Sequence, residues 1–255
     1  MMRAPGGERP AELLERSAPP DEKLTMRPPL LFVPGFNCTA ALWAPQLARF
    51  AGAFDCRVAD ATRADSMQAI AAQILADAPT SFALAGLSMG GYIAFEIMRQ
   101  APERVTRLAL LDTQATPESD QQRVLRAARV ETAKRDGIAA SADIAWPNSV
   151  HPARYEDIPL RDLVLRMALD TGLDAFLRQA AAITSRPDSR PSLSAIRAPT
   201  LVLVGEQDAL TPPDKAKEIA DAIPGAKLKI VPHCGHLSSL EMPESVNAAL
   251  ADFLG

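Results

Sequence analysis

The stretch FALAGLSMGGYIAFEIMR, residues 82–99, passes from an apolar run into a helical pattern with no loop between them. Gly86 and Gly90 flank Ser88 at the corner, in the order of a nucleophile elbow. A serine in so tight a strand-to-helix turn adopts a strained backbone, so the residues two before and two after it must be small. The turn exposes the Ser88 hydroxyl and puts the Met89 N–H at a helix N-terminus, where it can donate to a developing oxyanion.

The same five-residue pattern also occurs by chance, and its serine then only caps a helix. Two features favour the elbow over the helix cap. An apolar run precedes Ser88, and the small residues Gly91 and Ala94 follow on the helix, which lets the helix pack closely. The partners that such a serine requires also occur downstream.

Length and composition favour one globular domain with an insertion. The chain has 255 residues, 47% of them hydrophobic, and a formal net charge of -4, which gives no reason to expect a nucleic-acid partner. Cys38, Cys56 and Cys234 show no CxxC spacing, so we expect neither a disulfide framework nor a metal site. No segment has the length of a membrane span, and the N-terminal residues are charged and proline-rich. We expect a cytoplasmic protein without membrane contact.

Apolar runs alternate with helical patterns along the first half of the chain. Runs typical of buried strands lie at 30–34, 55–59, 82–87 and 105–111, and helical patterns lie at 39–50, 66–76 and after Ser88. Strands that alternate with helices in this way predict a parallel sheet with right-handed crossovers and helices on both faces.

The alternation stops between residues 116 and 194, which are helical in pattern with a break at Trp146-Pro147-Asn148. It then resumes with a strand at 199–205, a helix at 213–223, a strand at 227–231 and a helix at 243–254. We therefore divide the chain into a flexible leader at 1–28, an α/β core at 29–115 and 195–255, and a helical cap insertion at 116–194. The apolar side of the cap is expected to roof a mostly hydrophobic pocket and to govern which substrate enters.

A serine nucleophile needs a histidine to take its proton. The chain has three, His151, His233 and His236. His236 is the expected base because it follows the last strand behind Gly235, in a loop that can reach the carboxyl edge of the sheet. His233 is the alternative, and we expect it to pack beside the site.

The histidine in turn needs a carboxylate to orient it. Asp208 and Asp112 both come directly after a strand, at the sheet edge where ligands gather in open α/β proteins. Either one can instead be an ordinary turn or cap residue.

Four segments resemble the α/β-hydrolase fold family, in the esterase and lactonase group that includes 3-oxoadipate enol-lactonases and pimeloyl carrier-protein methyl esterases. The segments are FVPGF (32–36), GLSMGG (86–91), LVGEQDALTPP (203–213) and GHLSSLEMPESV (235–246). The resemblance implies the α/β-hydrolase fold, with a mostly parallel doubly wound sheet and an inserted helical cap. Two features depart from the family. Pro34-Gly35 stands where the family often has His-Gly, and the strands of the usual antiparallel sheet edge are missing or reduced to the leader.

The resemblance also implies the site residues. They are Ser88 as nucleophile, His236 as base, Asp208 as acid, and the backbone N–H groups of Phe36 and Met89 as oxyanion hole. The family order of serine, aspartate and histidine along the chain favours Asp208 over Asp112.

These residues predict a serine hydrolase that cleaves a small-molecule carboxylic ester or lactone through an acyl-enzyme, with no metal or organic cofactor. The same triad can serve carbon–carbon bond hydrolysis or perhydrolysis, and the fold also hosts slow-turnover ligand receptors. Dehalogenation is disfavoured because that chemistry in this fold uses an aspartate nucleophile. No motif indicates an oligomeric state.

Two further groups of side chains are candidates for the pocket. Trp43, Tyr92 and Phe36 can line an acyl pocket, although aromatic residues at such positions lie more often in the core. The cap arginines can receive a substrate carboxylate, although a charge on a helix is usually only solvated. These arginines are Arg154, Arg161, Arg166 and Arg178.

Overall fold

The structure, a computed structural model, describes Met1, Met2 and residues 27–255. The predicted leader at 1–28 therefore lies almost entirely outside the described residues. Within them, six strands form one sheet in the order β2-β1-β3-β4-β5-β6. The strands are β1 (Pro29–Val33), β2 (Asp55–Val58), β3 (Phe82–Leu87), β4 (Val105–Leu111), β5 (Thr200–Gly205) and β6 (Lys227–Val231). All neighbouring pairs are parallel, so the described sheet has no antiparallel edge.

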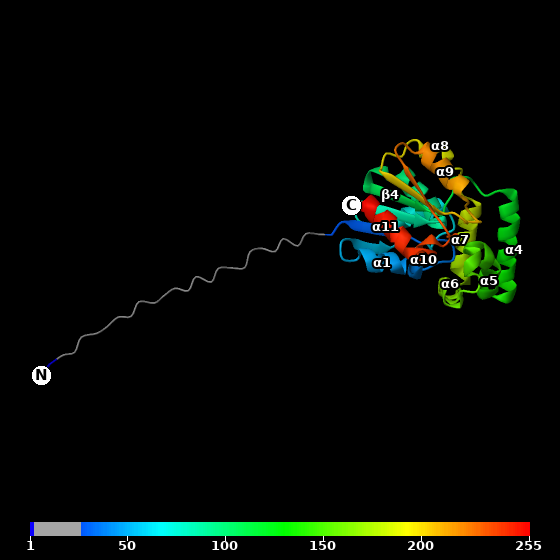
Figure 1. The fold of residues 1–255 in the computed structure, drawn as a ribbon, viewed down its shortest axis with the longest axis horizontal. Coiled ribbons are helices and arrows are strands. Elements are labelled where there is room, and N and C mark those ends of the chain that lie inside the picture. Colours follow the sequence, from blue (N-terminus) through cyan, green and yellow to red (C-terminus); the bar gives the residue numbers. More distant parts are fainter. Residues whose placement is uncertain (3–26) are drawn as a thin grey trace.

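Helices cover both faces of this sheet (Figure 1). One face packs against η1 (Ala40–Trp43), α1 (Ala44–Phe50) and α11 (Pro243–Leu254), with the short helix α10 (Ser238–Glu241) beside them. The other face packs against α2 (Met67–Asp77), α3 (Met89–Gln100) and α9 (Pro213–Ala222), and α8 (Arg190–Leu193) contacts α9. A short 3-10 helix, η2 (Pro102–Arg104), leads into β4. The predicted doubly wound parallel sheet is confirmed.

The central strands are apolar throughout because both of their faces are buried. In β1, Leu31 and Val33 join the core on the α2 and α3 side, whereas Leu30 and Phe32 join the core on the α1 and α11 side. All residues of β3 and β5 are buried. Successive side chains of a strand point to opposite faces, so continuous apolar runs are what a sheet covered on both sides requires.

Polar side chains start several of the helices. Thr39 accepts a hydrogen bond from the Ala41 N–H before η1, and Ser66 accepts one from the Ala69 N–H at the start of α2. Before α4 (Asp120–Asp136), Ser119 forms a capping box, a reciprocal side-chain and backbone pair with Gln122. These contacts satisfy N–H groups that have no partner within the helix.

The segment between β4 and β5 is helical. Its elements are α4 (Asp120–Asp136), α5 (Ile138–Ser149), η3 (Pro152–Arg154), α6 (Ile158–Thr171) and α7 (Leu173–Thr184). These helices contact one another and lie together beyond one side of the sheet (Figure 1). Treating residues 116–194 as a separate cap stays our interpretation of this arrangement.

The predicted break at Trp146-Pro147-Asn148 is wrong, because α5 continues through Pro147 to Ser149. Proline removes one backbone donor, but only two residues of α5 follow Pro147, so the lost hydrogen bond does not interrupt a longer run of helix. The buried ring of Trp146 also anchors this turn, since its Nε1–H donates to the Tyr155 carbonyl at 3.1 Å. Among residues 27–255, no helix combines the length and hydrophobicity needed to cross a membrane.

Candidate active site

Ser88 occupies the corner between β3 and α3 with a left-handed backbone, φ 55° and ψ -114°. The neighbouring glycines make this corner possible. A Cβ atom on Gly86 would overlap the backbone of Gly90, and one on Gly90 would overlap the carbonyl of Val33 in β1. The strained conformation is therefore held by backbone packing, as expected for a serine that must project from the sheet.

Thr113, in the loop that follows β4, fixes the same corner. Its hydroxyl donates to the Ser88 carbonyl at 2.8 Å. A Cβ atom on Gly91 would collide with the Thr113 side chain, so Gly91 must be a glycine for Thr113 to reach this carbonyl. Thr113 follows β4 in sequence and had no motif to mark it.

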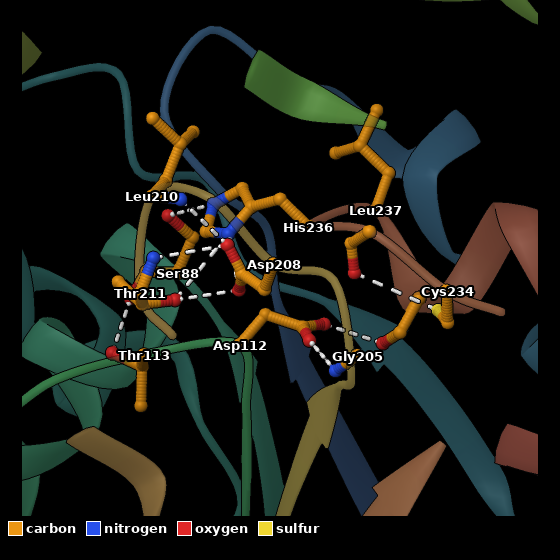
Figure 2. A network of polar contacts seen from close by, with 12 residues as sticks. Ser88, Asp112, Thr113, Gly205, Asp208, Leu210, Thr211, Cys234, His236 and Leu237 are labelled. Carbon is orange, nitrogen blue, oxygen red and sulfur yellow. Dashed lines mark hydrogen bonds and ion pairs between the residues drawn. The ribbon is translucent and has the colours of Figure 1, made fainter. Parts of the chain in front are cut away.

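The structure brings Ser88, His236 and Asp208 together, although they lie far apart in the sequence (Figure 2). The Nε2 atom of His236 lies 2.9 Å from Ser88 Oγ, and its Nδ1 atom lies 2.8 Å from Asp208 Oδ2. His236 and Asp208 are buried. This arrangement can pass the serine proton to the imidazole while the carboxylate holds the ring in one tautomer.

Asp208 is itself held by the loop that follows β5. Its Oδ1 atom accepts hydrogen bonds from the N–H groups of Leu210, at 2.8 Å, and Thr211, at 2.9 Å. The Thr211 hydroxyl donates to Oδ2 at 2.7 Å and lies 3.4 Å from His236 Nδ1. We did not predict a contact for Thr211. It lies in the segment 203–213 that resembles the family, but its contact with Asp208 depends on the turn after β5.

The pKa values of the two partners move apart. Burial opposes ionisation of Asp208, but the charge of His236 and the hydrogen bonds from His236 and Thr211 outweigh it and lower the Asp208 pKa below 3.8. Burial also opposes protonation of His236. The Asp208 carboxylate overcomes this effect, with help from Asp112 and Glu241, and raises the His236 pKa above 6.5. The site thus stabilises an imidazolium next to a carboxylate.

Asp112, the alternative acid, has other partners. One carboxylate oxygen accepts a hydrogen bond from the Gly205 N–H at 3.0 Å (Figure 2). The other accepts one from the Ser238 hydroxyl. Burial and the nearby negative charge of Asp208 raise the Asp112 pKa well above its usual value. No hydrogen bond between Asp112 and His236 is present in the described chain, so the geometry favours Asp208.

The two predicted oxyanion-hole amides lie close to Ser88. A Cβ atom on Gly35, next to Phe36, would lie 3.6 Å from Ser88 Cβ, and Met89 directly follows the serine. Across residues 27–255, neither the Phe36 N–H nor the Met89 N–H donates a hydrogen bond. Both donors are therefore free to receive a ligand oxygen.

A cavity of about 320 Å³ lies above Ser88 and His236. The core contributes Phe36 and Tyr92 to its wall, and the helices after β4 contribute Leu125, Ala145 and Val164 among others. Trp43 does not reach the cavity. It is fully buried against Phe32, with ring centroids 4.8 Å apart.

The other histidines take no part in this arrangement. His233 is exposed and has a left-handed backbone, and its ring lies against that of His151 with centroids 6.2 Å apart. His151 accepts a hydrogen bond from the Ala153 N–H at the start of η3. In the part of the chain that the structure describes, no group of three or more His, Cys, Asp or Glu side chains could hold a metal ion.

The arginines at the cavity are not those that we considered from the sequence. Arg154 forms an ion pair with Asp157, and Arg161 forms one with Asp143. Arg178 donates to the Thr62 carbonyl, and Arg166 is exposed. Among the described residues, the arginines that line the cavity are Arg126, Arg129 and Arg186. The signal for the first two was the spacing of Gln122, Arg126 and Arg129, which places them on one face of a helix.

Known proteins are similar to this chain in sequence over much of its length. The family described as alpha/beta hydrolase fold matches residues 59–243. A putative carbamate hydrolase RutD of Variovorax paradoxus is 30% identical over 88% of this chain and 91% of its own length. The match to a putative non-heme bromoperoxidase BpoC of Mycobacterium tuberculosis, 28% identical, covers 66% of this chain and spans 66% of that protein.

Two solved structures extend the comparison. A thermophilic esterase from Thermogutta terrifontis superposes with a TM-score of 0.81 and 29% identity, and the match covers 90% of each chain. An enol-lactonase from Burkholderia xenovorans superposes with a TM-score of 0.82 and 24% identity, covering 91% of this chain and 93% of that one, a likeness of fold. The parallel sheet, the serine corner and a family match over residues 59–243 together lead to one conclusion. The chain belongs to the alpha/beta hydrolase fold family.

Proposed function

We propose that this protein is a serine hydrolase that cleaves a carboxylic ester or lactone through an acyl-enzyme. One observation carries the proposal. Ser88 Oγ lies 2.9 Å from His236 Nε2, and His236 Nδ1 lies 2.8 Å from Asp208 Oδ2, beside a cavity of about 320 Å³. A cavity of this size suits a small organic molecule.

In the first half of the reaction, Ser88 Oγ attacks the carbonyl carbon of the substrate and His236 Nε2 takes the hydroxyl proton. The negative charge moves to the former carbonyl oxygen. The N–H groups of Phe36 and Met89, which are free to donate, stabilise that oxygen. Collapse of this intermediate breaks the bond to the alcohol oxygen, and the His236 proton goes to the leaving alcohol.

In the second half, a water molecule attacks the acyl-enzyme and gives its proton to His236. The second tetrahedral intermediate expels Ser88 Oγ, which recovers the proton, and the carboxylic acid leaves. Asp208 stays ionised throughout, because its lowered pKa keeps it a carboxylate while the imidazole is charged.

The relatives support hydrolysis as the reaction class. Proteins named as an esterase and a putative carbamate hydrolase are 29% and 30% identical to this chain over most of their length. The ester or lactone bond is the finer part of the proposal. It rests on the triad geometry and on the apolar wall of the cavity.

Three alternatives are separated by one set of assays. Carbon–carbon bond hydrolysis and perhydrolysis use the same three side chains, and a slow receptor would acylate without normal turnover. The test is hydrolysis of 4-nitrophenyl acetate and of a panel of esters and lactones, beside a diketone and a peracid assay. A burst of 4-nitrophenol followed by its steady release, with esters or lactones as the best substrates, supports the proposal. No reaction with any ester or lactone contradicts it.

A further inference from the structure

Arg129 of α4 is a partly buried cation for which no charged partner is found among residues 27–255. Its Nε atom is shielded from solvent and makes no hydrogen bond within residues 27–255. Burial, together with the nearby charge of Arg126, lowers the Arg129 pKa to about 10, so the guanidinium remains charged at neutral pH. Burial raises the pKa of the neighbouring Cys38 thiol to about 12, so this thiol stays neutral and supplies no counter-charge.

The cavity wall around Arg129 has an excess of positive charge. Arg126 and Arg186 also line it, and the lining contains one carboxylate, Glu118. Glu118 accepts from Arg126 Nε at 2.6 Å, so it balances Arg126 rather than Arg129. Arg186 uses its Nε and Nη1 groups on the carbonyls of Thr116 and Ile183. Arg129 is thus the lining arginine for which no hydrogen bond is found among the described residues.

Aromatic rings connect these cations to the reacting end of the cavity. The Cζ atoms of Arg126 and Arg129 lie 5.1 and 5.3 Å from the centroid of the Phe36 ring. Phe36 is the residue whose backbone N–H we assign to the oxyanion hole. On another part of the wall, the Cζ atom of Arg186 lies 4.3 Å from the centroid of the Tyr92 ring. The cationic part of the cavity is therefore one side chain away from the place where the substrate carbonyl would lie.

An unpaired guanidinium in a shielded site is costly, and a bound anion would remove that cost. Arginine also presents parallel N–H donors in the geometry that a carboxylate accepts with two oxygens. Arg129 and Ser88 both line this cavity, and its wall as a whole is mostly apolar, which suits a short hydrocarbon chain.

We propose that Arg129, with Arg126 beside it, forms a carboxylate-binding subsite, and that the natural substrate is an ester or lactone with a free carboxylate remote from the scissile carbonyl. The inference rests on the proposed function and names its substrate class. It also assigns to Arg129 the selection between charged and neutral substrates.

The kinetic test compares two esters of similar length, mono-4-nitrophenyl glutarate and 4-nitrophenyl pentanoate. The ratio of their kcat/KM values is measured for the wild type, Arg129→Met and Arg129→Lys. We expect Arg129→Met to lower this ratio about ten- to a hundredfold, and Arg129→Lys to retain part of it because the charge remains. The control is Arg135→Met on the same helix, whose exposed pair with Asp136 lies away from the cavity, and it should leave the ratio unchanged.

A binding test does not depend on catalysis. Glutarate is titrated into the same four proteins by calorimetry, after thermal unfolding has shown that each is folded. Arginine-dependent glutarate binding without hydrolysis of either ester would support the subsite while contradicting the proposed function. Hydrolysis of both esters with an unchanged ratio in Arg129→Met, and no glutarate binding, would overturn the subsite and leave the hydrolase proposal intact. An equal loss with both esters would show that Arg129 only supports the Phe36 loop, and would also overturn the subsite.

Discussion

The buried carboxylate of Glu241 binds the backbone on both sides of His236. It accepts hydrogen bonds from the backbone N–H groups on both sides of the histidine, at 3.2 Å from Gly235 and 3.0 Å from Leu237. A third hydrogen bond, at 2.7 Å, comes from the His151 N–H in the segment between β4 and β5. One buried carboxylate therefore holds the histidine loop and ties it to the helical segment that roofs the cavity.

Replacing Glu241 by Gln should loosen this loop, because the amide NH2 group of Gln cannot accept from backbone donors. We expect a loss of about 1–3 kcal/mol in unfolding free energy. At a temperature where the variant is folded, kcat/KM should fall about ten- to a hundredfold from misplacement of the imidazole. Glu244→Gln, an exposed residue of α11, is the matched control and should change neither quantity. Equal behaviour of the two variants would show that Glu241 does not position His236.

Replacing Asp208 and Asp112 by Asn, one at a time, shows which of them is the acid that orients His236. Asp208→Asn should reduce kcat about 10⁴-fold, because the amide no longer fixes the reactive tautomer or stabilises the imidazolium. Asp112→Asn should cost less than about tenfold, since its amide oxygen can still accept from the Gly205 N–H and Ser238 Oγ can accept from its NH2 group. Steady-state kinetics of the two purified variants decide between them, and a larger loss at Asp112 would reverse the assignment.

The dependence of kcat/KM on pH should report on His236. This base must be neutral to accept the serine proton, and its pKa is raised mainly by Asp208 against the effect of burial. Activity should therefore fall with decreasing pH through an apparent pKa above 6.5. The Asp208→Asn variant lacks the negative charge that raises the His236 pKa. In this variant the fall in activity at acidic pH should occur at a lower pH, even though the remaining rate is small. A fall at an unchanged pH would mean that another group controls it.

The helices after β4 should set the acyl-length preference. Ala145 of α5 lines the cavity, so Ala145→Leu shortens the space available to an acyl chain. We expect kcat/KM for 4-nitrophenyl hexanoate to fall about tenfold relative to that for the acetate ester. Ala127→Leu on the exposed side of α4 is the control. An unchanged acyl-length profile in Ala145→Leu would contradict the role of this segment as a selective roof.

Much of the fold could be predicted because its signals are local. Continuous apolar runs such as those of β3 and β5 identify strands buried on both faces, and the glycines around Ser88 identify a corner. The continuation of α5 through Pro147 could not, because it depends on how the buried Trp146 anchors that turn. Tertiary packing outweighed the local preference there.

Part of the candidate site could also be predicted from the sequence. Ser88, Asp208 and His236 each lie in a short motif at the end of a strand, so topology alone brings them to one edge of the sheet. Glu241 and Thr211 lie in two of the segments that resemble the family, but their contacts depend on backbone donors and turn geometry that the residue types alone do not reveal. Arg129 was hidden in a charged helix. The role that we propose for it rests on the absence of a counter-ion among the described residues, which is a property of the packed structure.

The most direct test of the account is covalent labelling of the nucleophile. The protein is incubated with a fluorophosphonate probe, and the modified residue is located by mass spectrometry of the digested chain. We expect one adduct per chain at Ser88, slower labelling in His236→Ala, and none in Ser88→Ala, which should stay folded because removing the hydroxyl leaves no large cavity. Labelling that persists in Ser88→Ala, or a wild-type protein that hydrolyses esters but takes no label at Ser88, would contradict the assignment of Ser88 as the nucleophile.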